Sequence, residues 1–430
     1  MRLVRLELSY GGKPITVEVP EGSVIDVLEV PAVPPVPDPE AAVVEALWNP
    51  VGTRRLRDLA TGKRNAVIMV PDRTRPAPLD IILPQVLQEL AAGGIGPESV
   101  TILIGLGTHR AMTTPEIEEY LGADLVRQVK VLNHEWWDPR QLIDLGRTRS
   151  GIPIQINRVV YEADLKIALG GVKPHRAAGW SGGAKMIQPG VSGPETTGAT
   201  HWLSAQFGVE EILGKVDNPV RREMEDIAAR VGLDFCLNYV LNNDYRLVAV
   251  YAGHYIGAHR HCVEMARPFY IKRISELADI VLAGCSAAAT NMWANGAGPN
   301  SAELVIKPGG TIVLFAPCPD GVAREHPEVL EYGYIPFTEV KRLVEAGVIK
   351  DKCAAAHIVH GGAKLHRKNL QCILVSEGVT ATEASRLRLE YATSPQEAVD
   401  RAFRRHGARA RCYVYPGYTF AELIIEWAGC

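Results

Sequence analysis

Short, continuously apolar runs recur along the first half of the chain and alternate with segments that have the hydrophobic period of a helix. The runs lie at residues 65–72, 99–109, 129–136 and 163–171. Helical patterns such as PLDIILPQVLQELAAGG (78–94) and TTPEIEEYLG (113–122) lie between them. Strands that are apolar on both faces, in alternation with helices, are typical of a mostly parallel sheet covered on both sides.

The same alternation resumes after residue 271. Buried-type strands are expected at 277–286, 309–318, 371–379 and 411–418, with helices such as FTEVKRLVEAG between them. We therefore expect an α/β fold of two α/β domains with mostly parallel sheets. The N-terminal domain is expected at residues 1–270 and the C-terminal, Rossmann-like domain at residues 271–430.

Turn-forming residues mark two hairpins and one connector. The chain opens with alternating residues on either side of Gly11-Gly12, which predicts a hairpin, and residues 235–254 predict another that turns at Asn242-Asn243-Asp244. Prolines in the segment 31–40 disfavour a helix and indicate an extended connector.

Composition and charge narrow the class of protein. A net charge of −3 over 430 residues gives no electrostatic reason to expect nucleic acid as a partner. The N-terminus lacks the apolar core of a signal peptide, and the absence of a long apolar run predicts no membrane span. Eight scattered cysteines without a C-x-x-C pair indicate reduced thiols, so we expect a cytoplasmic protein.

The loop PDRTRP (71–76) follows the first buried strand, at a position where open α/β sheets bind ligands. Asp72 and Thr74 are suited to cap a following helix, whose free N–H groups bind phosphate. Arg73 and Arg75 add cationic forks for phosphate or carboxylate. The alternative is an ordinary helix cap beside two solvated arginines.

Two further loops at strand ends carry ionisable residues. GLGTHR (105–110) places His109 beyond a buried strand, where a structural histidine is the alternative. The glycine-rich segment KPHRAAGWSGGAKMIQPGVSG (173–193) carries His175, Arg176 and Lys185, and His201 follows in TTGATH. Imidazoles that meet in one crevice suit proton transfer or metal ligation, and a lysine among glycines suits phosphate binding or nucleophilic attack.

A second histidine group lies in GHYIGAHRHC (253–262). His254 and His261 are spaced to share a helix face, and His259 lies between them, which permits metal binding. The alternative is the start of a helix that joins the domains.

Four segments, in this order and spacing, resemble the nickel-dependent lactate racemase family: DRTRP (72–76), GTHR (107–110), PH…GWSGGAKMIQPGVSG (174–193) and TTGATH (196–201). The likeness covers nearly the whole chain and includes AELVIKPGGTIVLFAPCPDG (302–321). It implies a racemase or epimerase that inverts the C2 centre of a 2-hydroxy acid by reversible hydride transfer. It also implies an active site in the cleft between the domains, with the C-terminal domain closing over the substrate.

The family uses a nickel-pincer nucleotide (pyridinium-3,5-bisthiocarboxylic acid mononucleotide with nickel), made by dedicated cofactor-synthesis proteins and attached to a lysine. The resemblance implies Lys185 as this attachment point and His201 as the nickel ligand. His109 and His175 are then the acid/base pair. The loop formed by Asp72, Arg73, Thr74 and Arg75 binds the cofactor, with Arg75 also near the substrate.

The chain departs from the family in its expected substrate contacts. Members that act on lactate carry a glutamine and, three residues later, a lysine, where this chain has Ala294 and Ala297. Losing a charge-assisted contact typically costs about 1.5–3 kcal/mol. We therefore expect a larger or dicarboxylic 2-hydroxy acid, with Asn295 and Arg176 as candidate contacts.

Two other functions remain open at this point. One is an NAD-type dehydrogenase or lyase on the same fold, in which Lys185 binds phosphate. The other is a non-catalytic protein that binds a nucleotide or a hydroxy acid.

Overall fold

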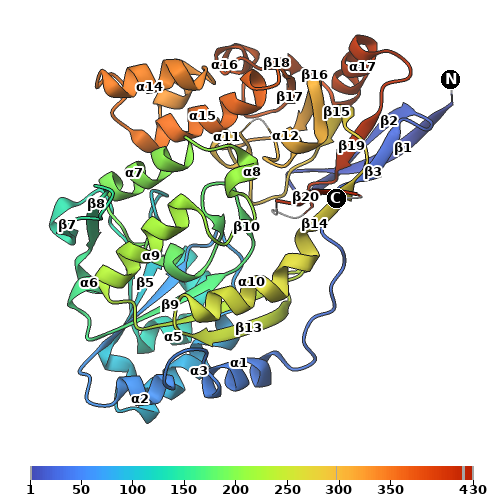
Figure 1. Cartoon of the computed structure of the whole chain (residues 1–430). Coiled ribbons are helices and arrows are strands. Elements are labelled where there is room, and N and C mark those ends of the chain that lie inside the picture. The colour runs from blue at the N-terminus through green and yellow to red at the C-terminus, as the bar shows by residue number, and fades with distance from the viewer. Residues whose placement is uncertain (1, 297, 419–421, 429–430) are drawn as a thin grey trace. The chain divides into compact units, whose positions relative to one another are not determined.

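The computed structural model describes residues 2–296, 298–418 and 422–428, and the chain forms two compact units (Figure 1). The central unit consists of residues 32–204 and 212–269. The terminal unit consists of residues up to 31, residues 205–211 and residues from 270 onward. Each unit has its own sheet and is described by itself.

The central unit is built on a six-stranded sheet of order β13-β12-β9-β4-β5-β6. All neighbours are parallel except the β12–β13 hairpin, which is antiparallel. The strands are β4 (Ala66–Pro71), β5 (Val100–Gly105), β6 (Lys130–Asn133), β9 (Leu165–Gly171), β12 (Phe235–Leu241) and β13 (Leu247–Gly253).

Both faces of this sheet are buried, as the continuous apolar runs predict. All six residues of β4 are buried, and alternate ones such as Ile68 and Val70 pack in one core with Leu47, Leu83 and Val86. Helices α1 and α3 thus cover that face, and Figure 1 shows α9 and α10 on the other side. The helices of this unit are α1 (Pro39–Trp48), α2 (Leu56–Ala60), α3 (Leu79–Ala92), α4 (Thr114–Leu121), α5 (Ala123–Gln128), α6 (Arg158–Glu162), α7 (Pro194–Ser204), α9 (Pro219–Val231) and α10 (Gly257–Tyr270).

The strand order indicates where a ligand is expected to bind. From β4 the chain proceeds to β5 and β6 on one side of the sheet, and later to β9 and β12 on the other. The order therefore reverses beside β4. In open α/β sheets the carboxyl ends of the strands at such a reversal form the ligand crevice. The loops after β4, β5 and β9 all leave this edge.

Smaller elements complete the central unit. Two short antiparallel pairs, β7 with β8 and β10 with β11, lie outside the main sheet. Their bounds, with those of three 3₁₀ helices, are β7 (Leu142–Arg147), β8 (Pro153–Asn157), β10 (Pro174–His175), β11 (Gly179–Trp180), η1 (Pro97–Ser99), η2 (Pro139–Gln141) and η3 (Gly183–Met186).

The terminal unit contains a second six-stranded sheet, of order β18-β17-β16-β15-β19-β3, in which all neighbours are parallel. Its strands are β3 (Val24–Val27), β15 (Ala278–Ala283), β16 (Ile306–Phe315), β17 (Gln371–Val375), β18 (Glu390–Ala392) and β19 (Cys412–Tyr415). A separate parallel pair joins β14 (Ile271–Ile274) and β20 (Ile424–Trp427). The helices are α11 (Met292–Asn295), α12 (Ala302–Val305), α13 (Glu328–Tyr332), α14 (Phe337–Glu345), α15 (Lys352–His366), α16 (Ala381–Arg386) and α17 (Pro395–His406), and α8 (Val209–Ile212) overlaps the boundary between the units.

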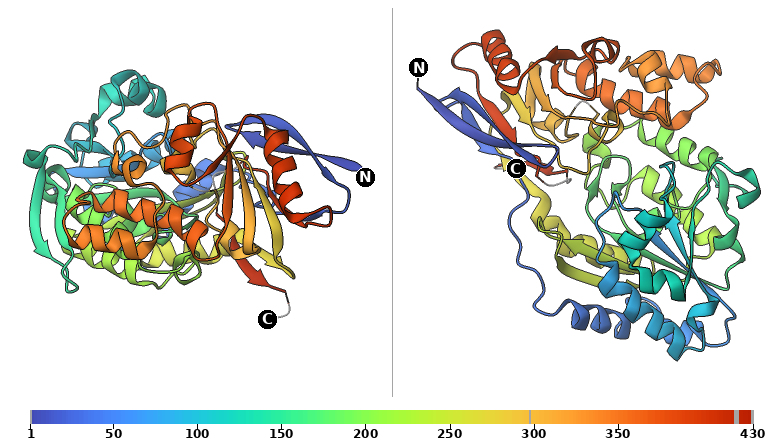
Figure 2. Two further views of the ribbon diagram at one scale, coloured as in Figure 1. Left: turned by 90° about the horizontal axis from the view of Figure 1, so that it is seen from above. Right: turned by 180° about the vertical axis from the view of Figure 1, so that it is seen from behind.

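The N-terminal 31 residues belong to the terminal unit, which differs from the expected continuous domain of residues 1–270. Strand β3 pairs with β19 and forms one edge of the six-stranded sheet. The hairpin of β1 (Leu3–Tyr10) and β2 (Lys13–Pro20) packs Leu8 and Val17 against the core that contains Val399 of α17. Figure 2 shows the hairpin beside α17 in both views. These partners lie far along the chain, so the local pattern of the hairpin does not reveal them.

The structure bears on two predictions made from composition, the absence of a membrane span and the reduced state of the cysteines. Within the described part of the chain, no helix is both long and apolar enough to cross a bilayer. The seven cysteines that the structure describes are buried and form no disulfide with one another.

Candidate active site

The loop after β4 is a tight turn organised by Asp72. The Asp72 Oδ1 atom accepts hydrogen bonds from the Thr74 amide at 2.8 Å and from the Thr74 hydroxyl, and the Arg75 amide donates to the Asp72 carbonyl at 3.0 Å. Helix α3 begins only at Leu79, with Pro78 at its N-cap. The expectation that Asp72 and Thr74 cap this helix is therefore wrong, because prolines at positions 76 and 78 keep the intervening backbone extended.

His109, after β5, is oriented by the same carboxylate. Its Nδ1 donates to Asp72 Oδ2 over 2.6 Å, which leaves Nε2 as the proton-accepting nitrogen of the neutral ring. The Trp136 indole donates to the His109 carbonyl at 2.9 Å and holds the backbone. Burial alone would raise the pKa of Asp72, but His109, Arg75 and Thr74 outweigh it and hold that pKa well below its usual range. Asp72 therefore stays ionised beside the imidazole.

His175 has the opposite arrangement. It lies at the end of β10, and its Nδ1 accepts a hydrogen bond from the Ala177 amide at 3.1 Å. The neutral ring thus carries its proton on Nε2. Burial, followed by the charges of Lys185 and Arg75, lowers the pKa of His175 well below 6.5, so this ring is neutral at physiological pH. One imidazole of the site is a proton acceptor and the other is a proton donor.

Lys185 lies in η3, at the end of the glycine-rich segment, and is half-buried. Burial lowers the pKa of its amine to about 7, with further lowering by Arg75 and Arg221 and partial opposition by Asp72. A large share of the amine is consequently neutral near pH 7, and a neutral amine is the nucleophilic form.

His201, the predicted metal ligand, lies in α7. Its Nδ1 donates to the Thr197 carbonyl one turn earlier, at 2.8 Å. A histidine that binds metal through Nε2 usually donates its other ring N–H to a carbonyl in this way, which fixes the tautomer and the ring orientation. Gln188, just after η3, donates to the Thr200 hydroxyl and ties the lysine segment to this helix.

The residues of the candidate site act on one another electrostatically. They are Asp72, Arg75, His109, His175, Lys185 and His201. The charges that act on His175 include those of Lys185, Arg75 and His201, and those that act on Lys185 include Arg75 and Asp72. The loops after β4, β5 and β9 therefore meet at the reversal of the strand order, as the sheet topology predicts.

Other predicted residues lie apart from this group or have different partners. The Arg73 guanidinium pairs with Glu116 at 3.0 Å, together with Arg110. Arg176 is only 6 % exposed, in the turn between β10 and β11. Its role toward a substrate stays a prediction, as does that of Arg73 toward a cofactor.

The substrate positions expected from the resemblance lie in the terminal unit. Ala294 and Asn295 belong to α11, after the carboxyl end of β15. The Asn295 amide donates to the carbonyls of Ala289 and Asn291 at 2.9 and 3.0 Å, so it stabilises its own loop. Ala297 lies outside the described residues.

The second histidine group does not form a metal centre. The ring of His259 donates to the Ser181 carbonyl at 2.9 Å, and that of His261 to the Gly257 carbonyl at 3.0 Å. Among the residues that the structure describes, no cluster of three histidine, cysteine or carboxylate side chains has the geometry to hold a metal ion. The helical alternative for residues 257–262 is correct, since they begin α10.

Sequence reasoning missed Arg221 and Asn238 and placed His259 in a separate histidine group, whereas all three contact the glycine-rich segment, from α9, β12 and α10. The sequence does contain a signal for the burial of Arg221. This residue lies at helical spacing from Met224, Ala228 and Val231, and all four are buried.

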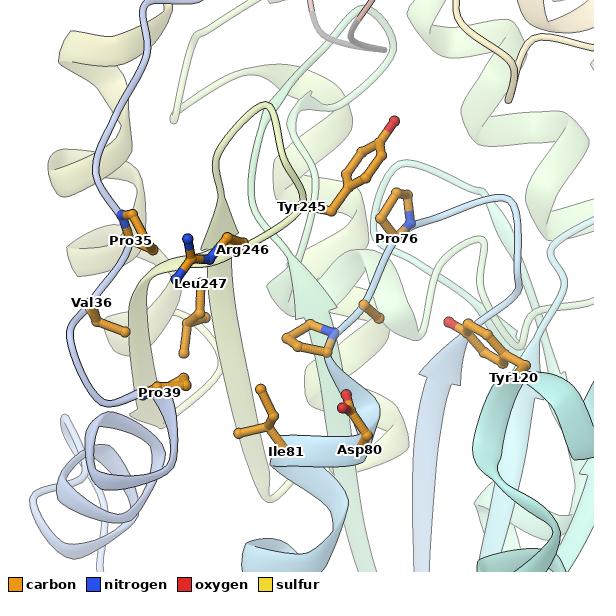
Figure 3. Close-up of a pocket in the computed structure, with 12 residues that line it drawn as sticks. Pro35, Val36, Pro39, Pro76, Asp80, Ile81, Tyr120, Tyr245, Arg246 and Leu247 are labelled. Atoms are coloured by element: carbon orange, nitrogen blue, oxygen red, sulfur yellow. The ribbon is translucent and has the colours of Figure 1, made fainter. Parts of the chain in front are cut away.

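An apolar cavity of about 440 Å³ adjoins the loop after β4 (Figure 3). Figure 3 shows it between Pro76, Tyr245 and the segment that carries Pro35 and Val36. The Tyr120 hydroxyl, on its wall, donates to the Pro71 carbonyl at 3.1 Å. None of the acid/base, lysine or metal-ligand candidates lines this cavity, so it is separate from the candidate reaction centre.

Comparison with known proteins gives a consistent result. A family model described as Lactate racemase N-terminal domain matches residues 10–210. The lactate racemase of Thermoanaerobacterium thermosaccharolyticum is 33% identical over 337 residues, which cover 75% of this chain and 76% of that protein. The lactate racemase of Lactiplantibacillus plantarum is 28% identical over 397 residues, covering 88% of this chain and 89% of that protein.

Solved structures extend the likeness to the fold. The lactate racemase apoprotein of T. thermosaccharolyticum superposes with a TM-score of 0.85 at 27% identity, over 98% of this chain and all of that chain. A Thermotoga maritima protein has a TM-score of 0.72 at 23% identity, over 90% of this chain and 98% of that chain. At that identity the second match supports the fold alone.

Proposed function

Because this chain belongs to the lactate racemase family, we propose that it inverts the C2 centre of a 2-hydroxy acid, as a racemase or epimerase. The observation that carries the proposal is the pair of imidazoles with opposite tautomers, His109 and His175, of which His175 also feels the charges of Lys185 and His201. In racemisation the hydroxyl proton is removed and returned, and the two enantiomers present the hydroxyl on different sides of C2. A proton acceptor and a proton donor that flank a single site suit this task.

We further propose that the central unit holds a nickel-pincer nucleotide. The donor set fits such a group: a partly neutral lysine amine for attachment and a histidine whose Nδ1–H is fixed by Thr197. An imidazole together with the cofactor's own sulfur donors suits nickel better than magnesium or calcium. When bound, the group supplies a hydride acceptor. Asp72, Thr74 and Arg75 would hold it from the loop after β4.

The side chains of this unit would then bind the substrate hydroxyl proton and the substrate carboxylate. The His109 Nε2 accepts the hydroxyl proton, and ionised Asp72 stabilises the resulting imidazolium. The His175 Nε2–H donates a hydrogen bond to the substrate oxygen and keeps it oriented. Arg75 provides a positive charge for the substrate carboxylate.

The substrate is proposed to be larger than lactate or dicarboxylic. Alanine stands in the sequence at positions 294 and 297, where members that act on lactate carry a glutamine and a lysine, whereas Arg75 and Arg176 provide positive charge in the central unit. Racemisation of a panel of 2-hydroxy acids, followed by chiral chromatography, identifies the substrate.

The decisive experiment is intact mass spectrometry with metal analysis on protein produced together with the cofactor-synthesis proteins. The expected result is nickel and one nucleotide adduct, located on Lys185 by peptide mapping. A Lys185→Arg variant should lose the adduct, whereas Lys215→Arg, on the surface of the same unit, should retain it. Exchangeable NAD without an adduct would instead favour a dehydrogenase, and ligand binding without turnover would favour a binding protein.

A further inference from the structure

The backbone of the glycine-rich segment before Lys185 is held by Arg221 of α9. Its guanidinium donates to the Gly182 carbonyl at 3.2 Å and to the Trp180 carbonyl through its second terminal nitrogen. Arg221 is 1 % exposed, so both bonds are shielded from water. The Gly182 carbonyl also accepts the Lys185 amide at 3.2 Å. Arg221 therefore shares an acceptor with the residue proposed to carry the cofactor.

Two other buried side chains complete this arrangement. Asn238 of β12 accepts the Gly183 amide at 2.8 Å. His259 of α10 donates to the Ser181 carbonyl at 2.9 Å, and burial followed by the charge of Arg221 lowers the pKa of His259 well below 6.5. The neutral ring is thus a fixed donor. Residues 180–183 are bonded through successive backbone groups to three different elements.

A buried guanidinium is a costly way to fill this position. Its neighbours on the buried stripe of α9 are Met224 and Ala228, and an apolar side chain in its place would pack without desolvating a charge. Burial lowers the pKa of Arg221 itself to about 10. The charge of Glu225 on the same helix offsets part of this cost and that of Arg260 adds to it, so the retained charge needs an explanation besides packing.

That explanation lies in the surroundings of Lys185. The charged and titratable groups that act on its amine or respond to it are Arg75 and Asp72 from the loop after β4, His175 from β10 and Arg221 from α9. Arg221 is a permanent positive charge on the side of the glycine-rich segment, and it favours the uncharged form of the amine.

We propose that Arg221 is a positioning residue for Lys185: it fixes the segment 180–183 in its bonded form and holds the Lys185 amine ready as a nucleophile before any cofactor is attached. The role of Lys185 as the attachment point rests on the proposed function. The arrangement itself does not, since it is present in the chain alone.

The first test uses the protein without cofactor. Acetylation of Lys185 by N-hydroxysuccinimidyl acetate is followed by peptide mass spectrometry from pH 6 to 10, with Lys215 as the internal reference. Arg221→Met should move the midpoint of Lys185 acetylation upward, toward that of an ordinary lysine, because it removes a positive charge that disfavours the protonated amine. Arg221→Lys, which restores the charge, should keep most of the low midpoint. Arg222→Met, the exposed neighbour on α9, is the matched control and should leave the profile unchanged.

Unfolding midpoints in urea establish that the variants are folded. If Arg221→Met does not fold, His259→Gln provides the second test, because it removes one contact to the segment and leaves the charge of Arg221. This variant should raise amide exchange in residues 178–190 without a large shift of the acetylation midpoint. An unchanged acetylation profile in folded Arg221→Met, or unchanged exchange in His259→Gln, overturns the proposal.

A second readout separates this proposal from the function on which it rests. In protein produced with the cofactor-synthesis proteins, Arg221→Met should show several-fold less Lys185 adduct than Arg222→Met. Absence of adduct in the unsubstituted protein counts against the proposed function, while the acetylation profile still tests Arg221. Full adduct in Arg221→Met counts against the positioning role and leaves the proposed function intact.

Discussion

Asp72 accepts hydrogen bonds from both Thr74 and His109. A substitution of Asp72 therefore tests whether this carboxylate supports the function of His109. Asp72→Asn replaces an ionised acceptor by a neutral amide, so His109 loses the partner that fixes its tautomer and stabilises its protonated form. We expect turnover of the 2-hydroxy acid to fall by about 100-fold or more in both directions.

The measurement is the racemisation rate at fixed cofactor content, determined by intact mass. Asp80→Asn, an exposed carboxylate two residues into α3, is the control and should retain the rate. A loss smaller than a few-fold in Asp72→Asn would show that His109 does not depend on this carboxylate.

At the same scale, sequence reasoning predicted the candidate acid/base, lysine and metal-ligand residues but not the side chains that hold them in place. His109, His175 and Lys185 stand out because ionisable residues are unusual in glycine-rich segments that follow strands, whereas His201 lies in α7 and its role is implied by the family resemblance. Arg221 has a weaker signal, its place on the apolar stripe of α9, and its partners are carbonyls 39 and 41 residues upstream. Contacts over such distances leave a weak trace in a single sequence.

At the scale of elements, the glycine-rich segment gives a second prediction. Gly182 has φ +77°, and a Cβ there would lie 2.7 Å from a Val172 methyl group and 2.8 Å from the Asn238 side-chain oxygen. Gly182→Ala should therefore lower the free energy of unfolding by about 1–3 kcal/mol from the backbone alone, and by more once the contacts are included.

The matched control is Gly62→Ala, which has φ +80° and no atom within 4 Å of the added carbon. Urea unfolding of both variants separates the conformational cost from the steric one. Equal losses in the two variants would mean that the segment yields easily around position 182, in conflict with a tightly bonded arrangement.

The predicted strands agree with the structure where both faces of a strand are buried. Strands β4, β5 and β9 lie within the predicted apolar runs because nearly every one of their residues is buried. The pair β7 and β8 was not predicted, since its exposed and buried residues do not form an apolar run. The fold of β3 onto β19 was also missed, because pairing between distant strands has no local signature.

At the scale of the whole molecule, buried neutral histidines predict how stability changes with pH. Burial lowers the pKa of His134 to about 4 and that of His357 to about 3, and it lowers the pKa of His175 and His259 well below 6.5. Below about pH 6.5 the unfolded chain protonates these rings and the folded chain does not. Unfolding then takes up protons, so the free energy of unfolding should fall as the pH drops from 6.5 toward 4.

Each ring contributes up to about 1.4 kcal/mol per pH unit in that window. Urea titrations at intervals between pH 5 and 7 measure the slope. His134→Gln should flatten it by about that amount, and the exposed His261→Gln should not. A slope that is unaffected by His134→Gln would indicate that this ring is protonated in the folded protein.

The pairing of β3 with β19 also bears on the order in which the protein is made. The Leu28 amide donates to the Val414 carbonyl, and the Cys412 amide donates to the Ser23 carbonyl. A ribosome that adds about 5–20 residues per second finishes β3 on the order of half a minute before it reaches β19. During that interval the central unit can fold. The apolar face of the β1–β2 hairpin has not yet met α17, against which it packs in the folded protein. The apolar face of the β1–β2 hairpin therefore stays exposed for most of the synthesis of the chain.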